Sequence, residues 1–221
     1  MQTSSNLQLL LVAFFAELGV ACNAAQHVVA RARIREGLVR LLRPGRWGCW
    51  LTSREIHRDV LASLREGTSF FASTCIFAIG GVLALAKNTD PLVGVAQEVT
   101  AMSSPVLLIQ VKLAFVALFL TNAFLKFVWS NRVFGYCAVL MSAVPNDPND
   151  PLTQPRAGQA AELNIRAAMN FNRGLRSMYF ALGALAWLLG ALPLFGATLV
   201  VVWVVWSREF ASIPRNILLA K

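Results

Sequence analysis

The feature that most constrains this chain is a set of apolar windows, each about 20 residues long and nearly free of charge. A helix rises about 1.5 Å per residue, so about 20 apolar residues cross a hydrocarbon core of about 30 Å. Such windows occur at residues 7–26, 69–86 and 105–129. Only 14% of the residues are charged, against roughly a quarter in soluble domains. The sequence therefore predicts an all-α, polytopic transmembrane helix bundle.

The last apolar stretch, residues 177–206, has two interpretations. It forms either one tilted helix, which gives four spans, or two helices at 171–192 and 194–212, which gives five. Gly190 and Pro193 favour two helices, because proline interrupts helical hydrogen bonding and glycine tolerates a reversal. The distribution of positive charge also bears on the choice.

Lysine and arginine are concentrated between the first two windows, in a basic loop at 30–67. Short basic loops stay on the cytoplasmic or matrix side of a membrane, so this loop is expected inside. Five spans also place the basic C-terminal residues inside, whereas four would leave them outside. We therefore predict five spans in a single membrane domain, residues 1–221, with a proline-rich loop at 145–156.

Apolar and basic positions alternate in the loop at 30–67, which predicts amphipathic helices on the inner membrane surface. Juxtamembrane cations gain roughly 1 kcal/mol each from anionic lipid. The alternative is a solvated loop that only sets the topology. We expect anionic lipid, including cardiolipin, and no nucleic acid as partner. The arginines expected to bind lipid are Arg31, Arg33, Arg35, Arg40, Arg43, Arg46, Arg173 and Arg176.

Four polar side chains lie inside predicted spans: Glu17, Asn23, Lys112 and Asn122. A carboxylate in hydrocarbon costs about 2.5–3.5 kcal/mol on insertion scales, so Glu17 needs a partner. Counted from the outer membrane surface, Glu17 and Lys112 differ in depth by roughly 5 Å, which a lysine stem can cover. Asn23 and Asn122 lie at about the same depth. We therefore predict that the first and third spans are in contact.

On the third predicted helix, at 100° per residue, Lys112, Lys126 and Ser130 fall within about 40° of one another and Asn122 lies about 80° from Lys112, which predicts a polar stripe. The stripe either lines a path for ions or protons, or serves contacts between helices. Two or three polar residues per helix are few for a water-filled path, which favours helix contacts. The tryptophans near the span ends are expected to face lipid as interface anchors. They are Trp129, Trp187, Trp203 and Trp206.

The sequence shows no catalytic, metal or cofactor set. The cysteines lack CxxC spacing, and there is no Ser-His-Asp set, phosphate-binding glycine loop or HExxH motif. His27 and His57 could bind a haem only if they faced each other at one depth. We therefore expect no enzyme activity, no metal and no cofactor.

Several segments together resemble a known family pattern, in the same order along the chain. They are RWGCW at 46–50, LASLR at 61–65, FASTC at 71–75, AFLKFVWSNR at 123–132, FNRGLRSMYF at 171–180, AW at 186–187 and REF at 208–210. The pattern is similar to that of domain of unknown function 599, a family of bacterial and plant membrane proteins. Glu66 departs from it, because the family has asparagine there. The resemblance implies an integral membrane protein and no particular activity.

These observations favour a non-enzymatic accessory subunit of a larger membrane complex. The expected location is a bacterial plasma membrane or a mitochondrial inner membrane, where a respiratory or ATP-synthase assembly would contain such a subunit. The alternative is a small ion channel or proton-coupled transporter that uses Glu17, Lys112 and Asn122.

Overall fold

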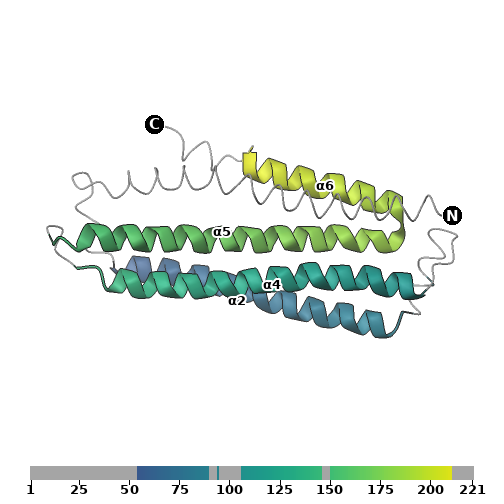
Figure 1. Ribbon diagram of the computed structural model, residues 1–221, viewed down its shortest axis with the longest axis horizontal. Coiled ribbons are helices and arrows are strands. Elements are labelled where there is room, and N and C mark those ends of the chain that lie inside the picture. The colour runs from purple at the N-terminus through teal and green to yellow at the C-terminus, as the bar shows by residue number, and fades with distance from the viewer. Residues whose placement is uncertain (1–53, 90–93, 95–105, 146–149, 211–221) are drawn as a thin grey trace. The chain divides into compact units, whose positions relative to one another are not determined.

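The regular structure of the chain is helical throughout the part that the computed structural model describes. That part is residues 54–89, 94, 106–145 and 150–210, with side chains placed between 59 and 207. Figure 1 shows its elements, which are α2 (Arg54–Lys87), α4 (Val106–Ser142), α5 (Thr153–Leu185), the 3-10 helix η1 (Ala186–Leu189) and α6 (Ala191–Phe210). No strand occurs in these ranges. The predicted all-α class is confirmed for the described residues.

Two helices are long and apolar enough to cross a membrane, α2 from Asp59 onward and α4 over its whole length. α2 has 34 residues and α4 has 37, which correspond to about 51 and 55 Å of helix. Both exceed a hydrocarbon core of about 30 Å, so in a membrane each would extend well beyond the hydrocarbon. α6 has a shorter apolar stretch, Ala191–Ser207.

The last part of the predicted basic loop at 30–67 does not form a separate amphipathic helix. Residues 54–66 are the first part of α2, which runs without a break into the predicted span at 69–86. Between them lie only Gly67, which costs about 1 kcal/mol in a helix without ending it, and Thr68. The Thr68 hydroxyl donates to the Arg65 carbonyl at 2.7 Å, so this buried side chain is satisfied within the helix.

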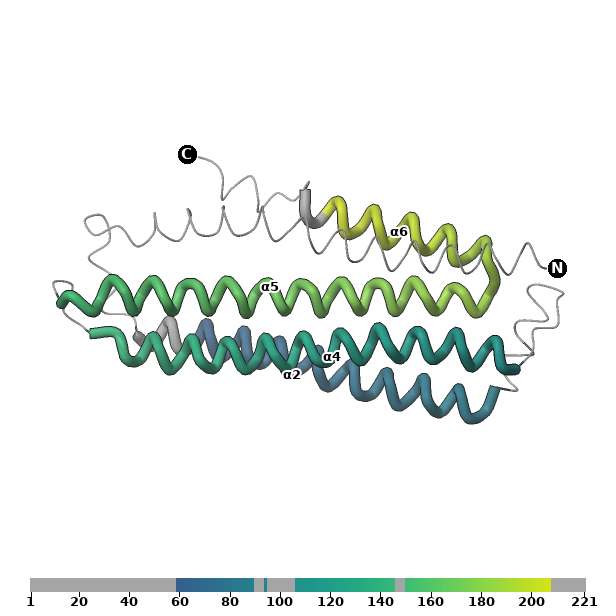
Figure 2. Tube along the Cα trace, in the orientation of Figure 1, coloured from purple at the N-terminus to yellow at the C-terminus, as the bar shows by residue number. Residues whose placement is uncertain are grey.

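The apolar stretch 177–206 is divided into two helices, so its interpretation as a single helix is wrong. The chain reverses at Gly190, whose φ of 125° and ψ of −175° suit only glycine. Pro193 is the third residue of α6, in the first turn, where a backbone N–H has no helical partner. Figure 2 shows α6 turning back at the end of α5. The count of five spans stays a prediction, because the window at 7–26 lies outside the described residues.

The connection between α4 and α5 is shorter than the predicted loop at 145–156, because α5 already begins at Thr153. Asp150 closes a turn before the helix: its Oδ1 accepts the N–H of Leu152 at 2.8 Å and its carbonyl accepts the N–H of Thr153 at 3.0 Å. Arg156 Nη1 then donates to the Ala143 carbonyl at 2.6 Å. This bond ties the start of α5 to the end of α4.

The described residues form two compact units, each with its own core. Unit 1 comprises the described parts of Cys75–Ala123 and Leu175–Lys221, and unit 2 those of Ala24–Thr74 and Phe124–Gly174. The core of unit 1 consists of Val82, Ile109, Leu113, Val116, Leu120, Ala181 and Ala184, with a second cluster of Phe180, Trp187 and Leu194. The core of unit 2 consists of Leu61, Val133, Phe134, Cys137, Ala160 and Ala167.

Candidate functional site

Lys112 on α4 is a charged side chain that is only 4% exposed. Its Nζ donates a hydrogen bond to the Trp187 carbonyl oxygen at 3.0 Å and lies 5.5 Å from the centre of the Trp187 indole ring. A carbonyl oxygen and the face of an indole both attract a cation. Lys112 therefore connects α4 to η1 within unit 1.

The carbonyl group that Lys112 contacts lies in the last helical turn before the reversal. Carbonyls at a helix C-terminus lack helical partners and carry partial negative charge, which a cation stabilises. The same oxygen accepts the N–H of Gly190 at 3.2 Å. Lys112 and Gly190 thus satisfy one carbonyl together, at the point where the direction of the chain changes.

Trp187 is not the lipid-facing anchor that its position in the sequence predicts. Its side chain is 5% exposed, whereas that of Trp203 is 69% exposed. The Phe115 ring lies beside it, with 6.0 Å between centroids, and Leu194 packs in the same cluster. Its Nε1 is buried and has no hydrogen-bond partner among the described residues. Because an indole N–H can only donate, this atom is a buried donor that lacks an acceptor.

Asn122 makes another polar contact from α4 within unit 1. Its Nδ2 donates to the Ser177 hydroxyl of α5 at 2.8 Å, and the Ser177 side chain is buried. The structure thus gives Lys112 and Asn122 partners that the sequence analysis missed. Their predicted partners, Glu17 and Asn23, lie outside the described residues, so those two pairings stay predictions.

Three phenylalanine rings from three helices pack together in unit 2. Phe71 of α2, Phe127 of α4 and Phe171 of α5 have centroids 5.4, 5.5 and 5.6 Å apart, within the range of favourable aromatic contacts. Phe127 is fully buried and lies against Gly174, where a Cβ atom would be 2.7 Å from the ring. The close approach of α5 to α4 at this point therefore requires glycine.

Hydrogen bonds to backbone carbonyls also connect α4 to α5 in unit 2. The buried Ser130 hydroxyl donates to the Ala167 carbonyl at 2.8 Å, and the Cys137 thiol donates to the Ala160 carbonyl at 3.3 Å. Ser130 belongs to the polar stripe predicted on this helix. Here it serves contact between helices.

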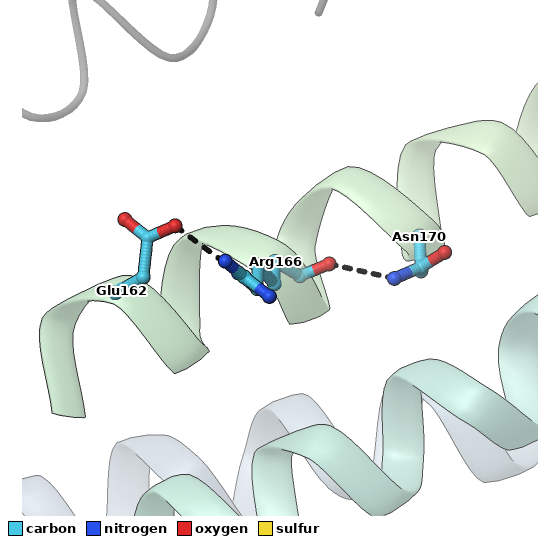
Figure 3. Close-up of polar contacts among 3 residues, drawn as sticks. All are labelled: Glu162, Arg166 and Asn170. Carbon is cyan, nitrogen blue, oxygen red and sulfur yellow. Dashed lines mark hydrogen bonds and ion pairs between the residues drawn. The ribbon is translucent and has the colours of Figure 1, made fainter. Parts of the chain in front are cut away.

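α5 presents a polar face in unit 2 (Figure 3). Arg166 Nε lies 3.1 Å from Glu162 Oε1, and the two side chains are 60% and 40% exposed. Asn170 Nδ2 donates to the Arg166 carbonyl at 2.9 Å. An exposed pair adds only about 0.3–0.5 kcal/mol to stability, but an exposed charged pair in hydrocarbon would be costly. This face is therefore suited to water or lipid headgroups.

The arginines predicted to bind lipid fall into two sets. Those between residues 31 and 46 lie outside the described part of the chain. Arg173 is half-buried, and Arg176 is only 8% exposed, so neither is fully open to the surface. Arg65 is exposed on α2, where its Nε donates to Asn131 Oδ1 at 3.3 Å. Lipid binding by the predicted set stays a prediction.

The described residues contain no group of three or more His, Cys, Asp or Glu side chains placed to hold a metal ion. Cys75 and Cys137 are buried free thiols. His27 and the side chain of His57 lie outside the described part. The expected absence of a metal and a cofactor therefore stays a prediction.

Comparison with known proteins gives one match. The family described as "Protein of unknown function, DUF599" matches residues 52–214, which is most of the chain. No curated protein and no solved structure matches significantly. The family description assigns no activity, so the function has to be argued from the geometry.

Proposed function

The chain belongs to the DUF599 family, as its sequence motifs predicted, and from this we propose a function. In this proposal the protein is a non-enzymatic accessory subunit of a larger membrane complex. Its apolar helix faces contact lipid tails and the helices of partner proteins. Its basic inner face binds anionic lipid and partner proteins.

The supporting observation is the exposure of large apolar side chains on α2, which could span a membrane, and on the shorter apolar helix α6. Phe77 on α2 is 80% exposed, and Leu192 and Trp203 on α6 are 86% and 69% exposed. Only 11% of the most apolar window of α2 is buried. Soluble monomers rarely expose contiguous apolar surface on this scale. Lipid tails would cover such side chains, and so would neighbouring helices.

The polar side chains of α4 support an accessory role over transport. Lys112, Asn122 and Ser130 each donate to a group on α5 or η1. Groups engaged in this way contribute to packing between helices and are less available to line a water-filled path. The alternative function, a small channel or proton-coupled transporter that uses Glu17, Lys112 and Asn122, requires such a path.

The lipid part of the proposal depends on positive charge at the inner surface. Arg65, Arg132 and Arg166 are exposed in unit 2, and the other basic residues of the loop at 30–67 would add to them. Each juxtamembrane cation gains roughly 1 kcal/mol near an anionic leaflet. Bacterial plasma membranes and mitochondrial inner membranes both supply anionic lipid, with cardiolipin as the expected ligand.

The test is extraction of the tagged full-length chain in a mild detergent, with mass spectrometry of the proteins and lipids that co-purify. We expect a stoichiometric partner protein and enrichment of anionic lipid. Two variants locate the partner, Phe77→Ala on α2 and Trp203→Ala on α6, because each removes one exposed aromatic side chain. The variant on the partner-facing helix should reduce co-purification, and the other serves as its matched control.

Reconstitution of the purified chain into liposomes without its partners distinguishes the accessory role from the alternative function. An accessory subunit should give no more ion or proton flux than empty liposomes. The accessory role would be overturned by a chain that purifies without partners and supports a flux that Lys112→Met abolishes.

A further inference from the structure

Two buried hydrogen-bond donors lie next to each other in unit 1, and neither has an anionic partner among the described residues. Lys112 Nζ has three N–H donors, and the structure shows one acceptor for them, the Trp187 carbonyl oxygen at 3.0 Å. Trp187 Nε1 is buried and has no hydrogen-bond partner in the described part of the chain. Because the ammonium lies over the same indole ring, 5.5 Å from its centre, the two donors are close in space.

Among the described residues of unit 1, no side chain supplies a negative charge to these donors. The described residues of unit 1 with placed side chains, at 75–89, 106–123 and 175–207, include no aspartate or glutamate. Trp187 packs in an apolar cluster with Phe180 and Leu194, and Phe115 lies against it. An ammonium buried among apolar groups costs several kcal/mol unless an anion or further hydrogen bonds compensate. One carbonyl oxygen and one ring face compensate only in part.

We propose that Lys112 Nζ and Trp187 Nε1 together bind a carboxylate. One carboxylate oxygen accepts from the ammonium and the other from the indole N–H, so the buried cation is neutralised and the unused donor gains an acceptor. The proposal goes beyond the function proposed above, and it holds whether or not the chain has protein partners.

The composition of the site favours a monoanion over a phosphate. The site offers one cation and one neutral N–H, which match the single charge and two oxygens of a carboxylate. A phosphate dianion is usually held by several cations or backbone N–H groups. The apolar neighbours would make an additional uncompensated charge costly.

A carboxylate can reach this site from two sources. One is the side chain of Glu17, the only acidic residue in the predicted span at 7–26, whose predicted depth is close to that of Lys112. The other is a free monocarboxylate such as a fatty acid from the surrounding lipid. The chemistry at Lys112 and Trp187 is the same for both sources.

The experiment is NMR of the full-length chain in detergent micelles, with ¹⁵N-labelled indole groups and octanoate as the free probe. The Trp187 resonance is assigned from its loss in Trp187→Phe. If Glu17 is the source, Glu17→Gln should move this resonance upfield, while octanoate leaves the wild type unchanged. If the source is free, Glu17→Gln should have no effect, and octanoate should move the wild-type resonance downfield to saturation. Either result supports the site.

Two lysine variants test whether the ammonium is required. Lys112→Met should remove the response, whichever source applies, and Lys112→Arg should retain it because it preserves the cation. Lys126→Met, on the same helix in unit 2, is the matched control and should behave as the wild type. The exposed Trp203 provides an internal reference.

The proposal would be overturned if the Trp187 resonance responded neither to Glu17→Gln nor to octanoate. It would also be overturned if octanoate moved the resonances of Trp203 and Trp187 equally, or if Lys112→Met left the response intact. The wild-type and Glu17→Gln measurements decide the matter even if Lys112→Met does not fold.

Discussion

Replacing Gly174 with alanine should destabilise unit 2, because the new methyl group would overlap the Phe127 ring. Three ring atoms would lie 2.7, 2.9 and 2.9 Å from the added Cβ. The ring cannot easily move away, since it is fully buried and packs against Phe71 and Phe171 with centroids 5.4 and 5.5 Å away. Overpacking of this kind costs about 1–3 kcal/mol.

The intrinsic preference of the helix acts in the opposite direction, and a matched variant separates the two effects. Alanine is favoured over glycine by about 1 kcal/mol in a helix interior. Gly158, on the same helix, has open space for 4 Å around the position that a Cβ would take, so Gly158→Ala should show only this gain. Gly174→Ala should therefore be less stable than Gly158→Ala by about 1–3 kcal/mol. For a chain of this size that difference lowers Tm by about 2–12 °C.

The assay is thermal unfolding of both variants and the wild type, followed by circular dichroism in the same detergent. Adding Phe127→Leu should reduce the specific cost of Gly174→Ala, because the atoms that clash with the new methyl group are removed. The coupling from this double-mutant cycle should fall within about 0.5–3 kcal/mol. Equal melting temperatures for Gly174→Ala and Gly158→Ala would refute the argument from close packing.

Three other predictions concern the reversal, the polar contact of α4 and the topology. Gly190→Ala should cost about 1–3 kcal/mol in thermal unfolding, because a φ of 125° is strained for any residue with a Cβ. A double-mutant cycle of Asn122→Ala and Ser177→Ala, in detergent, should give a coupling of about 0.6–2 kcal/mol from their 2.8 Å hydrogen bond. A cysteine introduced as Leu219→Cys should resist an impermeant thiol reagent added outside intact cells, because five spans place the C-terminus inside.

Each of these predictions has a control and a contrary outcome. Gly196 lies inside α6 with open space around the position that a Cβ would take, so Gly196→Ala should not destabilise the chain. Equal losses of stability for Gly190→Ala and Gly196→Ala would count against backbone strain. Additive effects of the Asn122 and Ser177 substitutions would show that the bond contributes nothing. Gln97→Cys lies between the second and third predicted spans, on the opposite side of the membrane from the basic loop, and should be labelled. Labelling of Leu219→Cys under the same conditions would require an even number of spans.

The sequence predicts the features of this fold that depend on local chemistry. Helical class follows from apolar windows long enough to cross a membrane, and the break before α6 follows from Gly190, which alone tolerates the observed φ. The extent of α2 was less predictable. Its polar first part and its apolar second part differ in composition, but no proline separates them, so a single helix contains both.

The candidate site was less accessible to sequence reasoning, because it depends on which faces of the helices meet. Depth arithmetic places Lys112 along the membrane normal but says nothing of its direction around the helix axis, so its contact with Trp187 was missed. Position near a span end predicts an exposed Trp187, whereas its burial depends on contacts with Phe115 of α4 and Leu194 of α6. Gly174 carried a signal, since it lies in one of the family motifs, at 171–180. Its physical reason required the position of Phe127.

The hydrogen bonds of α4 also bear on whether its polar stripe could open into a path for ions. Ser130 and Lys112 both donate to backbone carbonyls, and Asn122 donates to a side-chain hydroxyl. Water would have to replace each of these acceptors if the stripe were to line an open path. A buried polar group that loses its partner costs about 1–3 kcal/mol, and more when it is charged. Lys112 and Ser130 are buried, so opening would carry this cost at both positions unless water fully hydrated them, which favours a stripe that holds helices together.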